Sequence, residues 1–189
     1  MKIFLLRHGE AVKKADDTIL SDFGHQEAKA LASKLSELPI DKIFVSDYTR
    51  AIETLEPFRI MNPDIPIVKT SDLREIYRVI VGGPVREGTS DDRITKDSER
   101  STKVWEILKK EKGNVAVFCH GNIIRFFLMK SLDINPENLW DKMLITTGSI
   151  SIIEVDGDLI RVNAINLIDH SPLKKKFYER ERIDTIYQP

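Results

Sequence analysis

The feature that most constrains the fold is a set of four short apolar runs within the first 120 residues. They are too short to be buried helices, and we therefore predict strands at residues 2–6, 42–46, 65–69 and 114–120. The last run, NVAVFCH, is apolar almost throughout. Such a run is typical of a strand that is covered on both faces, as in a parallel sheet.

The segments between these runs carry apolar residues at helical spacing. Helices are predicted over residues 22–38, from Tyr48 onwards, and over residues 91–111, 122–132 and 136–143. Two later apolar runs flank Asp156-Gly157-Asp158, which predicts a β-hairpin. Residues 11–20 are expected to form a polar loop, and residues 70–90 a long functional loop. Alternation of strands and helices predicts an α/β fold with a largely parallel sheet.

Length and charge limit the classes of function. The 189 residues fit one domain, which we place at residues 1–170, followed by a charged tail at 171–189. The 29 basic and 30 acidic residues give a net charge of −1, which does not favour nucleic acid or acidic membranes as partners. Cys119 is the single cysteine, which fits a reducing compartment, and no apolar stretch is long enough to span a bilayer. We therefore expect a cytoplasmic protein.

Polar residues follow each predicted strand, where the sites of open α/β sheets form. Arg7-His8-Gly9 follows the first strand, and His120-Gly121-Asn122 ends the fourth. Arg50 follows the second strand and Glu75 follows the third. In a parallel sheet these four groups converge on one edge.

Two histidines and two arginines with few carboxylates form a cationic pocket. Arginine suits phosphate because its planar fork binds two oxygens, and the glycines let backbone N–H groups approach an oxyanion. A neutral imidazole can attack phosphorus, and a carboxylic acid can protonate the departing oxygen. A zinc site would recruit further ligands and would be repelled by the arginines, so we expect neither a metal nor a cofactor.

The same segments resemble the histidine phosphatase superfamily, also called the phosphoglycerate mutase-like family. The resemblance runs in order through residues 1–170 and is carried by LLRHGE, VSDYTRAIETLEPF, LREI, VFCHGNIIRFFL and TTGSISIIEVDG. It implies a three-layer α/β/α sandwich around a mostly parallel sheet. It also implies that His8 is a nucleophile that forms a phosphohistidine and that Glu75 is the general acid. Arg7, Arg50 and His120 would hold the phosphoryl oxygens, without a metal.

Departures from the family pattern bear on the substrate. Mutases usually carry a serine and an asparagine where this chain has Ala11 and Lys14, and they are usually longer. We therefore predict a phosphomonoesterase, with a phosphoglycerate mutase or a non-catalytic phospho-ligand-binding domain as alternatives. The expected substrate is a phosphorylated small molecule or a phosphoprotein. Within the family, residues 119–140 look similar to phosphoglycerate mutase family member 5, a protein serine/threonine phosphatase.

Several assignments stay open at this stage. Glu87 is the rival of Glu75 as the general acid, and Gly9, Gly121, Asn122 and Lys14 are candidate substrate contacts. Three further loop cations either extend the anion pocket or are merely solvated, namely Arg74, Arg78 and Arg86. Cys119 should point away from His120 as a buried thiol. The tail either folds back or mediates contacts in a homodimer.

Overall fold

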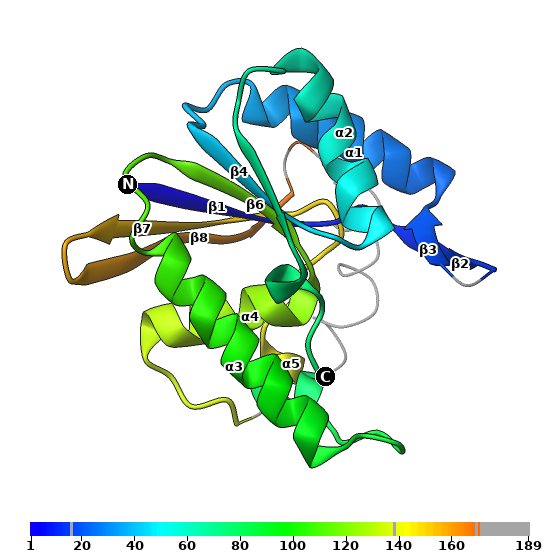
Figure 1. Cartoon of the computed structure of the whole chain (residues 1–189), viewed down its shortest axis with the longest axis vertical. Coiled ribbons are helices and arrows are strands. Elements are labelled where there is room, and N and C mark those ends of the chain that lie inside the picture. Colours follow the sequence, from blue (N-terminus) through cyan, green and yellow to red (C-terminus); the bar gives the residue numbers. More distant parts are fainter. Residues whose placement is uncertain (16, 138, 169, 171–189) are drawn as a thin grey trace, which may run out of the picture.

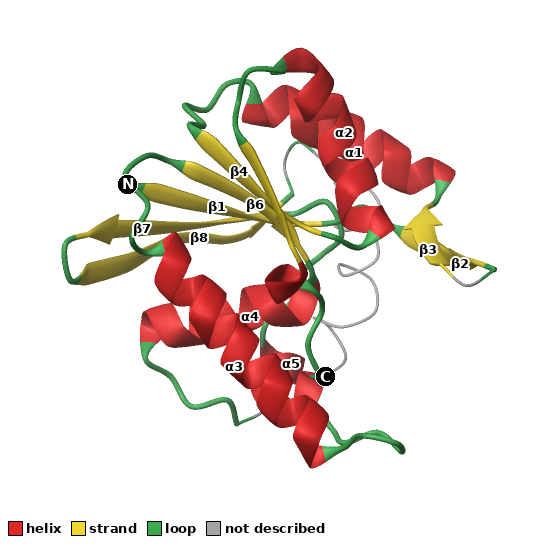
Figure 2. Ribbon diagram, viewed as in Figure 1, coloured by secondary structure: helices red, strands yellow, loops and turns green. Residues whose placement is uncertain are grey.

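A computed structural model describes residues 1–15, 17–137, 139–168 and 170. The predicted α/β fold is confirmed: six strands form a central sheet in the order β5-β4-β6-β1-β7-β8, with helices on both faces (Figures 1 and 2). The prediction for the tail at 171–189 falls outside the described residues.

Four strands of the sheet are parallel, and the last two strands run antiparallel as a hairpin. The six strands are β1 (Lys2–Arg7), β4 (Lys42–Ser46), β5 (Ile67–Thr70), β6 (Val115–Cys119), β7 (Ile150–Asp156) and β8 (Leu159–Leu167). The sheet is therefore mostly parallel, as predicted, and β1 lies in its interior between β6 and β7.

Two helical layers cover the sheet (Figure 1). One layer contains α1 (Asp22–Leu35) and α2 (Thr49–Met61). The other contains α3 (Asp91–Leu108), α4 (Gly121–Leu132) and the short α5 (Leu139–Lys142). Two separate cores form, because alternate residues of a strand point to opposite faces.

The fully apolar β1 shows this division most clearly. Phe4 and Leu6 pack in the core under α1 and α2. Ile3 and Leu5 pack in the core under α3 and α4. Burial on both faces is the reason for a continuous apolar run without alternation, and it fixes the strand end that carries Arg7.

The expectation for residues 11–20 was wrong. Instead of a loop, they form a two-stranded hairpin of β2 (Ala11–Lys14) and β3 (Asp17–Leu20). Most of its side chains are exposed, and Val12 is 47% exposed. Because the hairpin has almost no buried face, the alternation of apolar and polar residues that marks a strand is missing.

The long segment at 70–90 is largely irregular, as predicted, but contains two short 3₁₀ helices. These are η1 (Ser71–Leu73) and η2 (Arg78–Val81). Leu73, Ile76 and Val81 anchor the segment in the core under α3 and α4. Among the described helices, none is long and apolar enough to cross a membrane.

Candidate active site

His8 lies at the carboxyl end of β1, held by backbone hydrogen bonds from both neighbouring strands. The Arg7 N–H donates to the Ser149 carbonyl at 3.1 Å, and the His8 N–H donates to the Cys119 carbonyl at 3.1 Å. These hydrogen bonds hold the backbone of His8 beside the central strands of the sheet, so its side chain starts from a fixed position.

The hydrogen bonds of His8 define its tautomer. Its Nδ1 lies 2.7 Å from the Gly9 carbonyl oxygen, which can only accept, so Nδ1 carries the proton. Nε2 therefore keeps its lone pair, and Arg50 Nε donates to it at 3.1 Å. Burial lowers the pKa of His8 to about 3, and nearby Arg7 and Arg50 act in the same direction. The imidazole is therefore neutral at physiological pH, which is the form that a nucleophile requires.

His120 follows β6 and lies beside His8, with 5.1 Å between the ring centroids. Its Nε2 lies 2.9 Å from the Ser46 hydroxyl, at the end of β4. The Nδ1 of His120 is buried and has no hydrogen-bond partner among the described residues. Burial also lowers the pKa of His120 well below its usual value.

Arg7 and Arg50 reach the two histidines from different elements. Arg7 uses one terminal nitrogen to bind the Ile145 carbonyl, while its buried Nε has no partner in the described chain. Arg50 belongs to the first turn of α2. Thr54, one turn further, accepts from the Gly9 N–H at 3.0 Å and so ties this helix to the segment after His8.

Glu75 is held at the start of α4 by backbone N–H groups. Its Oε1 accepts from Ile76 at 3.1 Å, Asn122 at 3.0 Å and Ile123 at 3.3 Å. Burial raises the pKa of Glu75, although these donors and Arg7 oppose the shift. A carboxyl group with a raised pKa can be protonated closer to neutral pH, as a general acid must be.

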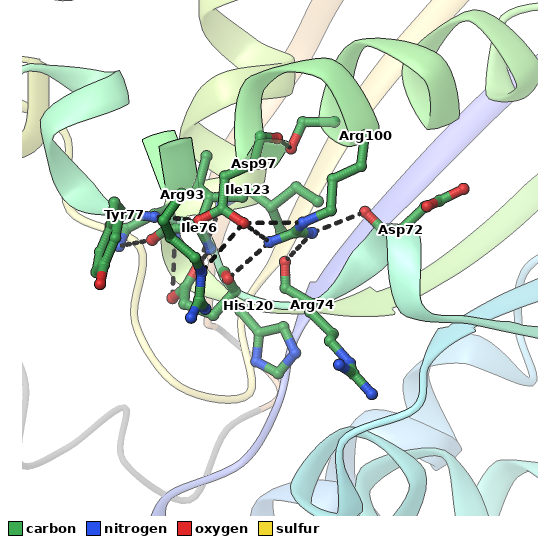
Figure 3. Close-up of polar contacts among 12 residues, drawn as sticks. Asp72, Arg74, Ile76, Tyr77, Arg93, Asp97, Arg100, His120 and Ile123 are labelled. Atoms are coloured by element: carbon green, nitrogen blue, oxygen red, sulfur yellow. Dashed lines mark hydrogen bonds and ion pairs between the residues drawn. The ribbon is translucent and has the colours of Figure 1, made fainter. Parts of the chain in front are cut away.

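A partly buried ion pair on α3, between Arg100 and Asp97, fixes the segment that carries Glu75 (Figure 3). Arg100 donates to the carbonyl oxygens of Asp72, Arg74 and Glu75 at 2.8–3.0 Å. Asp97, which is 3% exposed, binds Arg100 and also accepts from the Tyr77 N–H at 3.1 Å. Sequence reasoning missed this support because both residues belong to a helix that looks merely charged and solvated.

A cavity of about 740 Å³ opens in front of these groups. Its lining includes five of the predicted site residues: Arg7, Arg50 and Glu75 of the catalytic set, and Gly121 and Asn122 of the substrate contacts. His8 and His120 are not part of this described lining and are 8% and 0% exposed, and His8 contacts Arg50, which does line the cavity.

Of the predicted catalytic residues, Arg7, Arg50 and Glu75 therefore line the cavity, whereas His8 and His120 lie outside its described lining. Gly121 and Asn122, two of the predicted substrate contacts, also line it.

The other predicted substrate contacts lie elsewhere. Lys14 is exposed on the β2–β3 hairpin, outside the described lining of the cavity. The role of Gly9 in leaving room for an oxyanion stays a prediction, and the structure gives this glycine a packing role. A Cβ atom at Gly9 would lie 2.6 Å from the Gly24 carbonyl oxygen of α1, so the glycine permits close backbone packing.

The structure distinguishes the loop residues whose roles the sequence left open by whether they line the cavity. Glu87 is exposed and lies outside the described lining, whereas Glu75 faces the cavity. Arg74 turns away and binds Asp47 through two hydrogen bonds of 2.6 and 2.8 Å. Arg78 and Arg86 line the cavity.

Sequence reasoning missed Arg125 as a cavity residue. It lies on α4, is 8% exposed, and binds the Met143 carbonyl and the Asn122 side chain at 2.8 and 3.2 Å. Its signal was present: an arginine within the apolar stretch NIIRFFL cannot be solvated as an ordinary surface cation is.

Glu27 joins the two loops beside His8. Its carboxylate accepts from the Glu10 N–H at 2.6 Å and from the Thr147 hydroxyl at 2.9 Å. Burial raises the pKa of Glu27. Within the described residues, no group of three or more histidine, cysteine or carboxylate side chains could hold a metal ion.

Comparison with known families decides the class of the chain. The model of the histidine phosphatase superfamily (branch 1) matches residues 3–93 and 86–168. The chain belongs to this superfamily. The predicted resemblance is confirmed, as is the prediction of a phosphatase of the histidine phosphatase type.

Two curated relatives are themselves named as phosphatases. A protein of Schizosaccharomyces pombe, named a probable phosphatase, is 31% identical over 182 residues, which covers 82% of this chain and 87% of that protein. The mitochondrial serine/threonine-protein phosphatase PGAM5 of Xenopus tropicalis is 29% identical over 171 residues. That match covers 81% of this chain and 59% of PGAM5, so the chain spans about three fifths of this relative.

Solved structures share the fold. YhfR of Bacillus stearothermophilus superposes with a TM-score of 0.71 at 24% identity, covering 89% of this chain and 98% of that one. The α-ribazole phosphatase of Shigella flexneri gives a TM-score of 0.72 at 17% identity, covering 88% and 96%. The predicted phosphoglycerate mutase-like fold is thereby confirmed.

Proposed function

We propose that the chain is a metal-independent phosphomonoesterase that acts through a phosphohistidine on His8. The observation that carries this proposal is a set of unsatisfied donors beside a neutral imidazole. Arg7 Nε and His120 Nδ1 are buried without partners in the described chain. Leaving a buried polar atom unpaired costs roughly 1–3 kcal/mol, and phosphoryl oxygens would satisfy both atoms.

One tautomer of His120 makes it a donor to the phosphoryl group. The Ser46 hydroxyl accepts from the Tyr48 N–H at 3.4 Å and can donate its own proton to Nε2 of His120. In the proposed mechanism the proton of His120 is therefore on Nδ1, from which it is donated to a phosphoryl oxygen.

In the first step, the substrate draws Arg50 away from His8 and towards the phosphoryl oxygens. The lone pair on Nε2 of His8 attacks phosphorus, a P–N bond forms, and the P–O bond to the leaving alcohol breaks. Protonated Glu75 gives its proton to the leaving oxygen, so the alcohol departs neutral. The arginines and His120 stabilise the charge on the transferred group.

In the second step, the carboxylate of Glu75 takes a proton from water. The water oxygen attacks phosphorus and the P–N bond breaks, which releases inorganic phosphate and returns His8 to its neutral state. The relatives named as phosphatases support water as the acceptor in place of a second phosphoglycerate.

The test measures hydrolysis of p-nitrophenyl phosphate without added metal and with a chelator present. We expect turnover that the chelator leaves unchanged, and at least 1,000-fold slower turnover in His8→Ala, in the range that loss of a nucleophile causes. His25→Ala is the matched control, because His25 is exposed on α1.

Trapping identifies the intermediate and the acceptor. Rapid quenching with ³²P-labelled substrate should show an acid-labile, alkali-stable phosphoprotein that His8→Ala lacks. Loss of activity with the chelator, or full activity of His8→Ala, would refute the proposal. Faster interconversion of 2- and 3-phosphoglycerate than hydrolysis would show a mutase instead.

A further inference from the structure

We propose that the cavity contains a second anion-binding subsite, formed by Arg78, Arg125 and Trp140. It selects phosphomonoesters whose leaving alcohol carries another anionic group, either a carboxylate or a second phosphate. This inference rests on the proposed function, because it concerns the part of the substrate that remains after the phosphoryl group has left.

The charge of the cavity exceeds what one phosphoryl group needs. Its described lining contains two carboxylates, Asp17 and Glu75, and six arginines: Arg7, Arg50, Arg78, Arg86, Arg93 and Arg125. Arg7 and Arg50 lie beside the histidines and serve the phosphoryl end. Four arginines therefore remain for the rest of the substrate.

The cations that line the cavity differ from those just outside it in their partners. Arg74 pairs with Asp47, and Lys103 pairs with Asp72, both within 2.8 Å. Among the residues that the structure describes, Arg78, Arg86 and Arg125 form no ion pair. Arg93 Nε lies 3.7 Å from Asp97 Oδ1, and Asp97 also pairs with Arg100. Six guanidinium groups with two carboxylates in the same lining leave an excess of positive charge, and an anionic ligand would offset their repulsion.

Trp140 organises the subsite. The Arg78 guanidinium lies over its ring at 5.2 Å from the centroid, and the Arg125 guanidinium lies at 5.8 Å. The indole N–H donates to Asn122 Oδ1 at 3.1 Å, the same atom that accepts from Arg125. Gly83 completes the packing, because a Cβ there would lie 2.9 Å from both Arg78 and Trp140.

Both guanidinium groups are oriented through their Nε atoms. Arg78 Nε donates to the Pro84 carbonyl at 2.9 Å, and Arg125 Nε donates to the Met143 carbonyl at 2.8 Å. In the described structure, the terminal nitrogens of Arg78 form no hydrogen bond. A planar fork that is held in place but has free donors is suited to a carboxylate or phosphate.

Gly121 connects the subsite with the phosphoryl end. A Cβ at this glycine would lie 3.3 Å from Arg125 Nη1 and 3.5 Å from Arg7 Cζ. The two guanidinium groups therefore flank the same residue. A single compact substrate can reach both, with its ester phosphate at Arg7 and its second anion at Arg125 and Arg78.

The test compares kcat/KM for phenyl phosphate and 4-carboxyphenyl phosphate, of which only the second carries another anion. Phosphoserine peptides with glutamate or alanine next to the phosphoserine form the second arm, which distinguishes a protein source of that anion from a small molecule. We expect the wild type to prefer the second anion in at least one arm. Arg78→Gln should reduce that preference roughly 10- to 100-fold, the range for one charge-assisted contact.

Arg161→Gln is the matched control, since Arg161 is a cation on β8, outside the described lining. It should keep the wild-type preference. A wild type without preference in either arm, or an unchanged preference in Arg78→Gln, would overturn the subsite.

Absence of turnover on every ester would refute the proposed function and leave the subsite to be judged by binding. Calorimetry would then compare phenylphosphonate with 4-carboxyphenylphosphonate. Tighter binding of the carboxylated ligand, weakened in Arg78→Gln, supports the subsite. Equal binding refutes it.

Discussion

At the scale of single residues, the state of His8 is set by its surroundings. The imidazole is buried between Arg7 and Arg50, which makes a positive charge on the ring unfavourable and lowers its pKa to about 3. In the proposed mechanism the same arginines neutralise the phosphoryl group, so one arrangement would both keep the nucleophile deprotonated and attract its target.

This pKa predicts how stability depends on pH. The folded pKa of His8 lies below the usual 6.5, so between these values the unfolded chain binds more protons than the folded one. The contribution of His8 to the free energy of unfolding is complete above pH 6.5 and is lost as the pH falls towards 3. The slope approaches about 1.4 kcal/mol per pH unit within this window.

Urea titrations from pH 7 to pH 4 measure this dependence. The free energy of unfolding should fall less steeply for His8→Ala than for the wild type, because the variant lacks this group. Parallel curves for the wild type and His8→Ala would contradict the assigned pKa.

If Glu75 is the general acid, the effect of its substitution on kcat/KM should depend on the leaving group of the substrate. Glu75→Gln keeps the shape of the side chain but cannot donate the proton, and alkyl alcohols need that proton more than nitrophenol does. We expect kcat/KM to fall roughly 100-fold or more for an alkyl phosphate and much less for p-nitrophenyl phosphate. Glu87→Gln is the control, and equal losses on both substrates in Glu75→Gln would contradict the role.

At the scale of secondary structure elements, backbone contact between α1 and the loop after β1 positions His8. A Cβ at Gly24 would lie 2.0 Å from the Glu10 carbonyl oxygen, and one at Gly9 would lie 2.6 Å from the Gly24 carbonyl oxygen. The backbones of the helix and of the loop are therefore in direct contact, and neither glycine can carry a side chain unless the other backbone moves.

Gly24→Ala should therefore destabilise the chain and displace the loop that follows His8. We expect a loss of roughly 1–3 kcal/mol, in the range of overpacked cores, together with reduced kcat. Chemical denaturation and p-nitrophenyl phosphate hydrolysis measure the two effects. Gly157→Asn, at the open β7–β8 turn with φ of +60°, is the control, because asparagine tolerates this backbone conformation. A Gly24→Ala variant of wild-type stability would contradict the contact.

The central strands of the sheet were predictable because each buried strand is a short run of consecutive apolar residues. The runs at β1, β4 and β6 are apolar enough to exclude other interpretations, and the strand-end rule then groups Arg7, His8, Arg50 and His120. The β2–β3 hairpin was not predictable, since its pairing buries little surface. Arg100 and Asp97 were missed for a related reason: the burial of these charged residues depends on the distant segment that they hold.

At the scale of the whole molecule, a nearly neutral chain carries a strongly basic cavity. The net charge is −1, so attraction of an anionic substrate comes from the six arginines of the described lining. Such local attraction decreases with salt, because the Debye length shortens from about 10 Å at 0.1 M to about 3 Å at 1 M.

We therefore expect kcat/KM for 4-carboxyphenyl phosphate to fall roughly tenfold between 20 mM and 500 mM sodium chloride. The decrease should be smaller in Arg78→Gln and unchanged in Arg161→Gln. Stopped-flow or initial-rate measurements at fixed pH test this expectation. A rate that is independent of ionic strength would contradict a role for the arginine cluster in capture.

The position of Cys119 has a consequence for how the enzyme tolerates oxidants. The only thiol of the chain is fully buried in the core under α3 and α4, as the alternation along β6 predicts, and burial raises its pKa. Reaction with peroxide or alkylating agents requires an accessible thiolate, which this residue does not provide. The proposed catalysis by His8 uses no thiol, and the one thiol of the chain is shielded, so activity should persist under oxidative stress that inactivates phosphatases with a cysteine nucleophile.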